Sequence, residues 1–504
     1  MPSSADALTA TSGFGSAEKS TRSSPFAQAA HHAPCTGEGQ SHRAYDISKS
    51  RPVLVRCRPV EMVTGVPMAS PAPQPAFPPE ISQALARAQT LAAGQKLDEA
   101  EKLLAQYPHV PDCVFRRAAI LMTLERWAEA EAGFRALLKL APSHFDSAMG
   151  LAGALIEQNR AKEAIPLLEA AYKAQPGGRT LYFLGIGLDQ AGQKDRAAKL
   201  LAEARAHVIA QSEARNLLPS ELYMQISRRC NLRCAMCGHE VWKSNSGFME
   251  MEVFDRILEQ SKANGITTLH ILSGQGEPML HPQVFEMLEK AVAMGFNVGI
   301  VTNGTPLTPE RCEKLGKLGL AYIQFSFAGW DKDSYEATYV GAKFDRTLAN
   351  LHKMAETTKG TKTNFMVKAV CTGDNWAEVR DRTRAFLEGH GVDKVFTVIA
   401  NNFGGNVVHG KFHEHLGVWS LKNIEHQRLM PCRVLLRAVG VFCDGTVTAC
   451  ACYDSNAELK IGNIMEQTLA EIRQGPEFRK IVDAFRCGDV GSIPMCSKCD
   501  DPYG

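Results

Sequence analysis

Three cysteines crowd into the stretch 230–237, and their spacing constrains this chain more than any other feature. Cys230, Cys234 and Cys237 are separated by three and then by two residues, so all three thiols can turn toward one centre. Thiolates are the soft ligands that iron–sulfur clusters and zinc select. The spacing therefore predicts a metal site on a short loop.

The number of thiols leaves three interpretations open. A structural zinc site takes four protein ligands, and His239 stands two residues beyond Cys237, where it would supply the fourth. A [4Fe–4S] cluster on three cysteines instead leaves one iron for a ligand that is not protein. Buried cysteines that bind no metal are the third interpretation.

The composition is ordinary for a soluble globular protein and restricts the partners. The chain has 504 residues, 45% of them hydrophobic and 22% charged, which predicts several domains. A net charge of +2 favours neither nucleic acid nor an anionic membrane as the main partner. No apolar run approaches the length of a spanning helix. Because the cysteines cluster and no secretory signal is present, we expect metal ligands in a reducing cytoplasm.

Helix and strand patterns alternate directly after the cysteine loop. This alternation predicts a parallel sheet covered by helices. The predicted strands are 222–226, 268–272, 297–301, 321–327, 362–370 and 394–399. The predicted helices are 251–263, 282–294, 309–318, 347–358 and 376–388.

A glycine-rich turn ends the second predicted strand, in the sequence Ser-Gly-Gln-Gly-Glu-Pro at 273–278. Together with the cysteine loop, this turn resembles the radical S-adenosylmethionine (SAM) enzymes, which have Gly-Gly-Glu-Pro here. The resemblance covers about residues 221–504 and implies a partial (β/α)6 barrel. It also implies a [4Fe–4S] cluster on Cys230, Cys234 and Cys237, with SAM on the open iron.

The same resemblance assigns SAM contacts at three strand ends. The turn would receive SAM's amino group, although glutamine stands at 275 where the family has glycine. Segment 339–341 lacks the arginine often found there, and Ala328 replaces a common acid. Ser326 would reach a ribose hydroxyl. The residues expected to bind the cofactor are Gly274, Gln275, Gly276, Glu277, Asn303 and Ser326.

A second group of cysteines lies near the end of the chain. The spacing Cys432-x12-Gly445-x4-Cys450, followed by Cys496-x2-Cys499, resembles the SPASM auxiliary-cluster domain in its shorter, twitch form. The resemblance implies one auxiliary [4Fe–4S] cluster on these four cysteines, with structural zinc as the alternative. Three cysteines are left over, namely Cys443, Cys487 and Cys452, of which Cys452 could replace Cys450.

The chain repeats itself before the barrel. Ala130, Phe134 and Pro142 recur 34 residues later as alanine, leucine and proline at 164, 168 and 176. This period resembles tetratricopeptide repeats, a helical solenoid that binds proteins. Residues 1–78, rich in Ser, Ala and Pro, are predicted to be disordered. The predicted domains are therefore the repeats at 79–212, the barrel at 221–402 and the cysteine-rich domain at 425–504.

The family resemblance implies an enzyme that splits SAM and abstracts hydrogen from a substrate, with flavodoxin or ferredoxin as the electron donor. A peptide or protein held by the solenoid is the first substrate hypothesis. The second is a sugar-like alcohol that is oxidised or epimerised. A third, of another class, is a repeat scaffold with structural metal sites only. The sequence does not name the catalytic acid or base.

Overall fold

The computed structural model describes most of the chain after residue 76. The predicted disordered segment lies almost wholly outside the described residues, as do Gly274, Gln275 and Cys452. Within the described part, no helix is long and apolar enough to cross a membrane. The described ranges are 77–93, 96–242, 247–271, 276–371, 376–392, 394–400, 430–451 and 453–499.

The described chain begins with a region that is wholly helical, as predicted. Consecutive helices pack against one another, and the alanines at 100, 130, 164 and 197 are all buried where they meet. Glu125, Asn159 and Gly192 have positive φ in the turns, so the turn conformation also recurs every 33–34 residues. The resemblance to tetratricopeptide repeats stays a prediction. The helices are α2 (Pro79–Ala93), α3 (Leu97–Ala105), α4 (Pro111–Thr123), α5 (Trp127–Leu140), α6 (Phe145–Glu157), α7 (Ala161–Ala174), α8 (Gly178–Gln190) and α9 (Lys194–Glu213).

The predicted parallel sheet is confirmed, with all six predicted strands present. Its order follows the sequence from β1 to β6, as in an open barrel. Three strands that the sequence patterns did not predict extend it: β7 pairs parallel with β1, and β8 and β9 follow antiparallel. The strands are β1 (Glu221–Met224), β2 (Thr268–Ile271), β3 (Asn297–Thr302), β4 (Tyr322–Ser326), β5 (Asn364–Cys371), β6 (Val395–Ile399), β7 (Ala438–Val441), β8 (Thr446–Thr448) and β9 (Lys460–Asn463).

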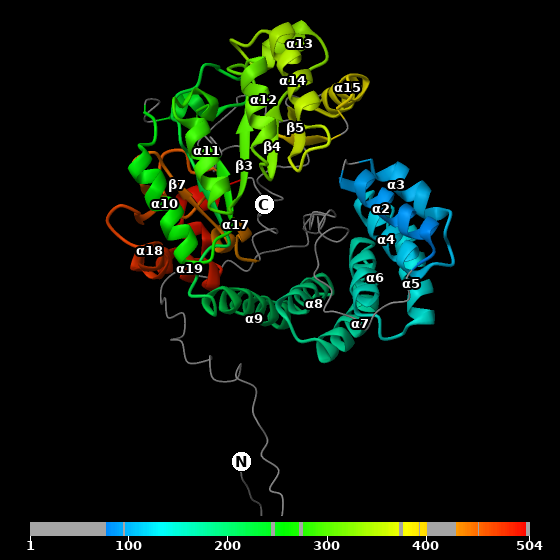
Figure 1. Cartoon of the computed structure of the whole chain (residues 1–504). Helices are drawn as coiled ribbons and strands as arrows, with labels where there is room; N and C mark the ends of the chain where they lie inside the picture. Colours follow the sequence, from blue (N-terminus) through cyan, green and yellow to red (C-terminus); the bar gives the residue numbers. More distant parts are fainter. Residues whose placement is uncertain are drawn as a thin grey trace, which may run out of the picture. The chain divides into compact units, whose positions relative to one another are not determined.

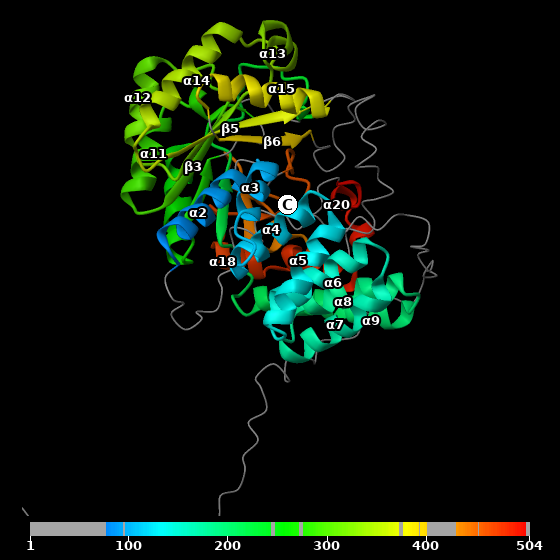
Figure 2. The same cartoon turned by 90° about the vertical axis from the view of Figure 1, so that its right-hand side faces the viewer.

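Helices cover the outer face of the sheet (Figures 1 and 2). Apolar side chains such as Leu222, Leu269 and Ile323 are buried beneath them. The helices are α10 (Met251–Ala263), α11 (Val284–Ala293), α12 (Pro309–Lys317), α13 (Lys332–Thr338), α14 (Phe344–Thr358) and α15 (Trp376–Gly389). The C-terminal part adds α17 (Arg433–Arg437), α18 (Leu469–Gln474), α19 (Pro476–Cys487) and α20 (Pro494–Lys498). Short 3-10 turns are η3 (Gly238–Val241), η4 (Pro278–Leu280) and η5 (Val490–Ser492).

The opposite face of the sheet carries polar side chains near the N-terminal ends of the strands. His270 Nδ1 lies 2.7 Å from the Tyr322 hydroxyl, and its Nε2 lies 3.3 Å from Glu221. The hydrogen bond with His270 and the Arg437 guanidinium lower the pKa of Glu221 to about 2. Gly299 leaves room for this cluster, because a Cβ there would lie 2.0 Å from the Tyr322 ring. Polar groups therefore lie at the N-terminal end of the barrel. In barrel folds, residues at this end serve stability rather than catalysis.

A buried arginine ties the C-terminal part to the start of the barrel. Arg473 is fully buried, no carboxylate in the described ranges pairs with it, and burial lowers its pKa to about 9. Its guanidinium donates to the carbonyls of Leu217 (2.7 Å) and Leu435 (3.0 Å) and stacks 3.7 Å from the Phe478 ring. One cation thus joins the segment before β1, the end of α17 and helix α19.

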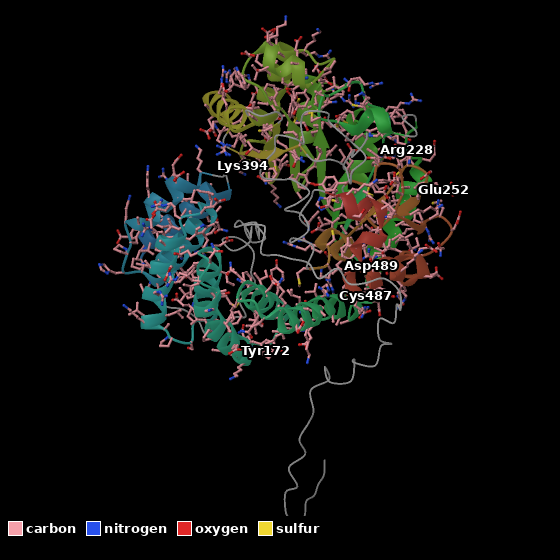
Figure 3. All side chains as sticks on the ribbon, turned by 180° about the vertical axis from the view of Figure 1, so that it is seen from behind. Tyr172, Arg228, Glu252, Lys394, Cys487 and Asp489 are labelled. Atoms are coloured by element: carbon pink, nitrogen blue, oxygen red, sulfur yellow. The ribbon has the colours of Figure 1, made fainter. Side chains whose placement is uncertain are left out.

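The last helix of the N-terminal helical region, α9, packs on α19 (Figure 1). Glu213 forms a 2.6 Å ion pair with Arg486, and Arg205 donates to the Arg486 carbonyl. Ile209 is buried in the same hydrophobic core as the barrel residues. Cys487 and Asp489, labelled in Figure 3, mark the end of α19 at this contact. Helix α9 therefore supports the barrel and is also the last helix of the N-terminal helical region.

Replacing Arg473 should destabilise the protein strongly. In Arg473→Met the buried carbonyls lose their donors, and we expect a loss of about 3 kcal/mol or more in the free energy of unfolding. Arg479→Met is the matched control, because that exposed arginine also donates to a carbonyl, that of Gln474, and should change stability by less than about 0.5 kcal/mol. Thermal unfolding of the metal-free proteins measures both. Equal midpoints for the two variants would contradict this role of Arg473.

Shortening the chain should separate the two roles of α9. A chain that begins at Gly178 keeps α8 and α9 and should unfold near the full-length temperature. A chain that begins at Arg215 loses Ile209 and Glu213, which exposes α19. We expect it to be less stable by about 3 kcal/mol, the scale of one buried aliphatic side chain and one partly buried ion pair. If both shortened chains unfold at the same temperature, α9 does not support the barrel.

Candidate functional site

The cysteine loop lies directly beyond β1, at the edge of the sheet where parallel strands end. Cys230, Cys234 and Cys237 are partly buried free thiols. Burial raises the pKa of each, to about 11 for Cys237, and the neighbouring thiols raise that of Cys234 further. The structure therefore brings the three predicted ligands close enough to disfavour one another's charge.

Two segments hold this loop through the backbone. Ala235 N–H donates to Thr338 O (2.9 Å), and Arg233 N–H donates to Val340 O (2.8 Å), so the segment after α13 pairs with the loop. On another side, the turn after β2 comes so close that a Cβ on Gly276 would lie 2.2 Å from the Ser227 carbonyl. With φ at +102°, only glycine suits this position. Gly276 is thus required for the packing of the turn against the loop.

Glu277 is the centre of a buried hydrogen-bond network. Its carboxylate accepts bonds from the Thr302 hydroxyl (2.6 Å), Asn303 N–H (2.7 Å) and Met279 N–H (3.0 Å). Its own N–H donates 2.7 Å to Arg229 O, immediately before Cys230. Burial raises the pKa of Glu277 to about 7 in spite of these donors. The carboxylate therefore joins the ends of β2 and β3, and its predicted contact with SAM stays a prediction.

Asn303 extends this network to the cysteines. Its side-chain amide donates 3.2 Å to Asn231 Oδ1 and lies 3.9 Å from Cys230 Sγ. Its own Oδ1 accepts from the Thr305 N–H and hydroxyl. Asn303 is thus placed beside the first cysteine, at the edge where a ligand of the cluster would also lie.

The end of β4 holds the remaining predicted contact. Ser326 is partly buried on the same face of β4 as Tyr322, at the strand end nearer the cysteine loop. Its predicted contact with SAM stays a prediction. The segment that lacks the family's arginine carries Tyr339, which is buried and stacks on Tyr335 at 4.9 Å. Tyr335 stacks in turn on Phe327 at 4.4 Å. Sequence analysis missed this aromatic stack, whose only signal is the spacing of aromatic residues around α13.

The C-terminal cysteines lie on short elements around β7–β9. Cys432 caps the N-terminus of α17, Cys450 follows β8, and Cys496 and Cys499 lie in and just after α20. These four are partly buried, and Cys487 is disulfide-bonded. Their assignment to one auxiliary cluster stays a prediction.

The donor set at the cysteine loop fits an iron–sulfur cluster. Three partly buried thiols oppose one another's ionisation, and iron offsets this cost because it takes thiolates as ligands. Among the described residues, no group of three or more His, Cys, Asp and Glu side chains is arranged to hold a single metal ion. His239 Nδ1 is buried and finds no hydrogen-bond partner in the described part of the chain.

Comparisons with curated proteins find relatives over less than half of this chain. A cofactor-modifying protein for tungsten-containing aldehyde ferredoxin oxidoreductase from Pyrococcus furiosus is 31% identical over 34% of this chain and 49% of its own length. An AdoMet-dependent heme synthase from Methanosarcina barkeri is 33% identical over 29% and 40%. A PqqA peptide cyclase from Granulibacter bethesdensis is 30% identical over 23% and 31%. The chain thus spans about half or less of these relatives.

Solved structures match at low identity. Streptococcus suis SuiB bound to precursor peptide SuiA is 18% identical, with 68% of this chain and 88% of that chain covered and a TM-score of 0.44. BtrN in complex with AdoMet and 2-DOIA is 20% identical, with 56% and 94% covered and a TM-score of 0.38.

Two family models match this chain in the regions that hold the cysteines. The model of the radical SAM superfamily matches residues 224–381, which include the cysteine loop and the ends of β1–β5. The SPASM model, described as an iron–sulfur cluster-binding domain, matches residues 432–500. The chain therefore contains a radical SAM domain followed by a SPASM iron–sulfur cluster-binding domain.

Proposed function

We propose that this protein reductively cleaves SAM at a [4Fe–4S] cluster on Cys230, Cys234 and Cys237 and abstracts hydrogen from a peptide or protein. The observation that carries the proposal is the cysteine loop, which the turn after β2, Asn303 after β3 and the end of α13 hold at one edge of the sheet. When bound, the cluster supplies an electron to SAM, which yields methionine and a 5′-deoxyadenosyl radical. The fold would position SAM and the substrate and would exclude water from the site.

The chain's own residues have distinct tasks in this proposal. Gly276 lets the turn approach the loop, and Glu277 fixes the turn against β3. Gly274 and Gln275 lie outside the described residues, and the family resemblance supports their completing the contact with SAM's amino group. Asn303 orients the loop beside Cys230, and Ser326 offers a hydroxyl to SAM's ribose.

We also propose an auxiliary [4Fe–4S] cluster on Cys432, Cys450, Cys496 and Cys499. The match of the SPASM model to this region supports it. A cluster ligated fully by protein would accept the second electron when a substrate radical is oxidised. We further propose the division into repeats at 79–212, barrel at 221–402 and cluster domain at 425–504, of which the family-model matches at 224–381 and 432–500 support the last two.

A peptide or protein is the substrate that the observations favour. Several relatives are named PqqA peptide cyclases, and a helical repeat region precedes the barrel in this chain. Repeat solenoids offer extended surfaces that suit peptides. A reductant such as flavodoxin or ferredoxin and a cytoplasmic location belong to the same proposal.

Metal analysis tests the two clusters. Protein prepared without oxygen should hold about eight iron and eight acid-labile sulfide per chain, four of each per cluster. Replacing Cys230, Cys234 and Cys237 together by Ala should remove about half of each. Bound zinc without labile sulfide would contradict the enzyme proposal and favour a scaffold with structural metal sites.

Glu277→Gln tests the network at the turn. One amide oxygen cannot accept from both Asn303 N–H and Met279 N–H, so one buried donor loses its partner. We expect a loss of about 2 kcal/mol in stability and at least about tenfold weaker SAM binding. Glu310→Gln, an exposed change in the first turn of α12, is the control. Calorimetric SAM titration and thermal unfolding measure the two effects, and wild-type values for both would refute this role.

A further inference from the structure

A buried hydroxyl beside the cysteine loop has an unmet hydrogen bond. Tyr339 is only 1% exposed, and its hydroxyl finds no partner in the described part of the chain. The hydroxyl of a buried tyrosine normally has a partner, because an unmet donor costs free energy. The hydroxyl of Tyr339 therefore calls for an acceptor that the described residues do not supply.

The backbone sets Tyr339 directly opposite Cys234. The N–H groups of the residues on either side of Cys234 donate to the carbonyls on either side of Tyr339, at 2.8 and 2.9 Å. The earlier N–H pairs with the later carbonyl, so the two segments run antiparallel and the two middle residues are paired. Burial raises the pKa of Tyr339, and the neighbouring Cys234 thiol raises it further.

The two side chains extend to the same, inner side of this pair. Directly opposite residues of antiparallel segments share a face, and the exposure of their neighbours agrees with this. Arg233, Ala235 and Val340 are exposed, whereas Cys234 is partly buried and Tyr339 is fully buried. A tyrosine side chain is longer than that of cysteine, so the hydroxyl extends past the thiol to the depth at which a bound cluster would lie.

Stacking fixes the direction of the Tyr339 ring. Its centroid lies 4.9 Å from that of Tyr335, and Tyr335 lies 4.4 Å from Phe327. All three rings are fully buried, and Phe327 N–H donates 3.0 Å to Lys368 O in β5. A hydroxyl on a ring held in this way loses little freedom when it makes a bond, so it is preorganised.

We propose that the Tyr339 hydroxyl donates a hydrogen bond to a sulfur of the cluster bound at Cys234 and thereby raises the reduction potential of that cluster. The inference rests on the proposed function, because it concerns the proposed [4Fe–4S] cluster. The reduced cluster carries one more negative charge than the oxidised one, so a donor stabilises it more. Val340 and Gly341 carry no side-chain donor, so the hydroxyl is the one that segment 339–341 offers.

Tyr339→Phe tests this bond, because it removes the hydroxyl and keeps the ring in the stack. The midpoint potential is measured on the anaerobic full chain by titration with dithionite, followed by electron paramagnetic resonance. The signal that changes when SAM is added identifies the cluster at the cysteine loop. We expect reduction to be disfavoured about tenfold, which corresponds to a midpoint potential about 59 mV lower for a one-electron couple.

Two further measurements separate this bond from a merely structural role. Electron–nuclear double resonance of the reduced protein in D2O, without SAM, should show one exchangeable coupling fewer in Tyr339→Phe than in wild type. The metal-free variant should unfold at or above the wild-type temperature, because the hydroxyl has no acceptor without the cluster. A lower unfolding temperature of the metal-free variant would show that the hydroxyl serves the fold instead.

Tyr322→Phe is the matched control. It also removes a hydroxyl from a barrel tyrosine, but this hydroxyl lies 2.7 Å from His270 Nδ1 at the N-terminal ends of the strands. The control should leave the potential and the exchangeable couplings of the cluster unchanged. An equal shift of the potential in both variants would overturn the inference.

The remaining outcomes separate the inference from the proposed function. A wild-type potential or an unchanged set of couplings in Tyr339→Phe would overturn the bond, and so would weaker SAM binding at an unchanged potential. If Tyr339→Phe assembles no cluster, the absence of an exchangeable coupling in wild type would overturn it. A wild-type protein that holds no iron, or whose reduced cluster does not cleave SAM, would instead refute the proposed function.

Discussion

One buried carboxylate joins the parts of the candidate site. Glu277 accepts three hydrogen bonds from the ends of β2 and β3, and its backbone N–H bonds to the residue before Cys230. Burying this group is unfavourable, as its raised pKa shows, and the three donors offset much of the cost. The position of the cysteine loop therefore depends on a carboxylate that could not be buried without its hydrogen-bond donors.

Much of the barrel was predictable because its signals are local. The six parallel strands are short apolar runs separated by helical patterns and turn residues, and each was found within a few residues of its predicted range. The strands β7–β9 were missed because they are only three or four residues long and, unlike the equally short β1 and β2, do not belong to a regular alternation of strands and helices. The cysteine loop was predictable from its spacing alone, and the three thiols are indeed neighbours.

The contacts that position the site were not predictable. Glu277 bonds mainly to backbone N–H groups, and Arg473 bonds to carbonyls from Leu217 and Leu435, far away in the sequence. Hydrogen bonds to backbone groups cannot be predicted from residue types, because every residue has these groups. A charged residue in a helix is expected to be exposed, so the burial of Arg473 could not be predicted either. The docking of α9 on α19 was missed for the same reason, since its contacts link residues more than 250 positions apart.

The segment without the family's arginine shows why that loss is tolerated in the fold. Thr338 and Val340 hold the cysteine loop through their carbonyls, which are present whatever the side chains are. The side chain between them is therefore free to serve the core, and Tyr339 does so by stacking on Tyr335. A buried arginine at this place would need hydrogen-bond or carboxylate partners. Tyr339 needs no ionic partner, because its ring is stabilised by stacking on Tyr335. The backbone thus keeps the loop in position while the side chain between those carbonyls makes this wall of the site more apolar.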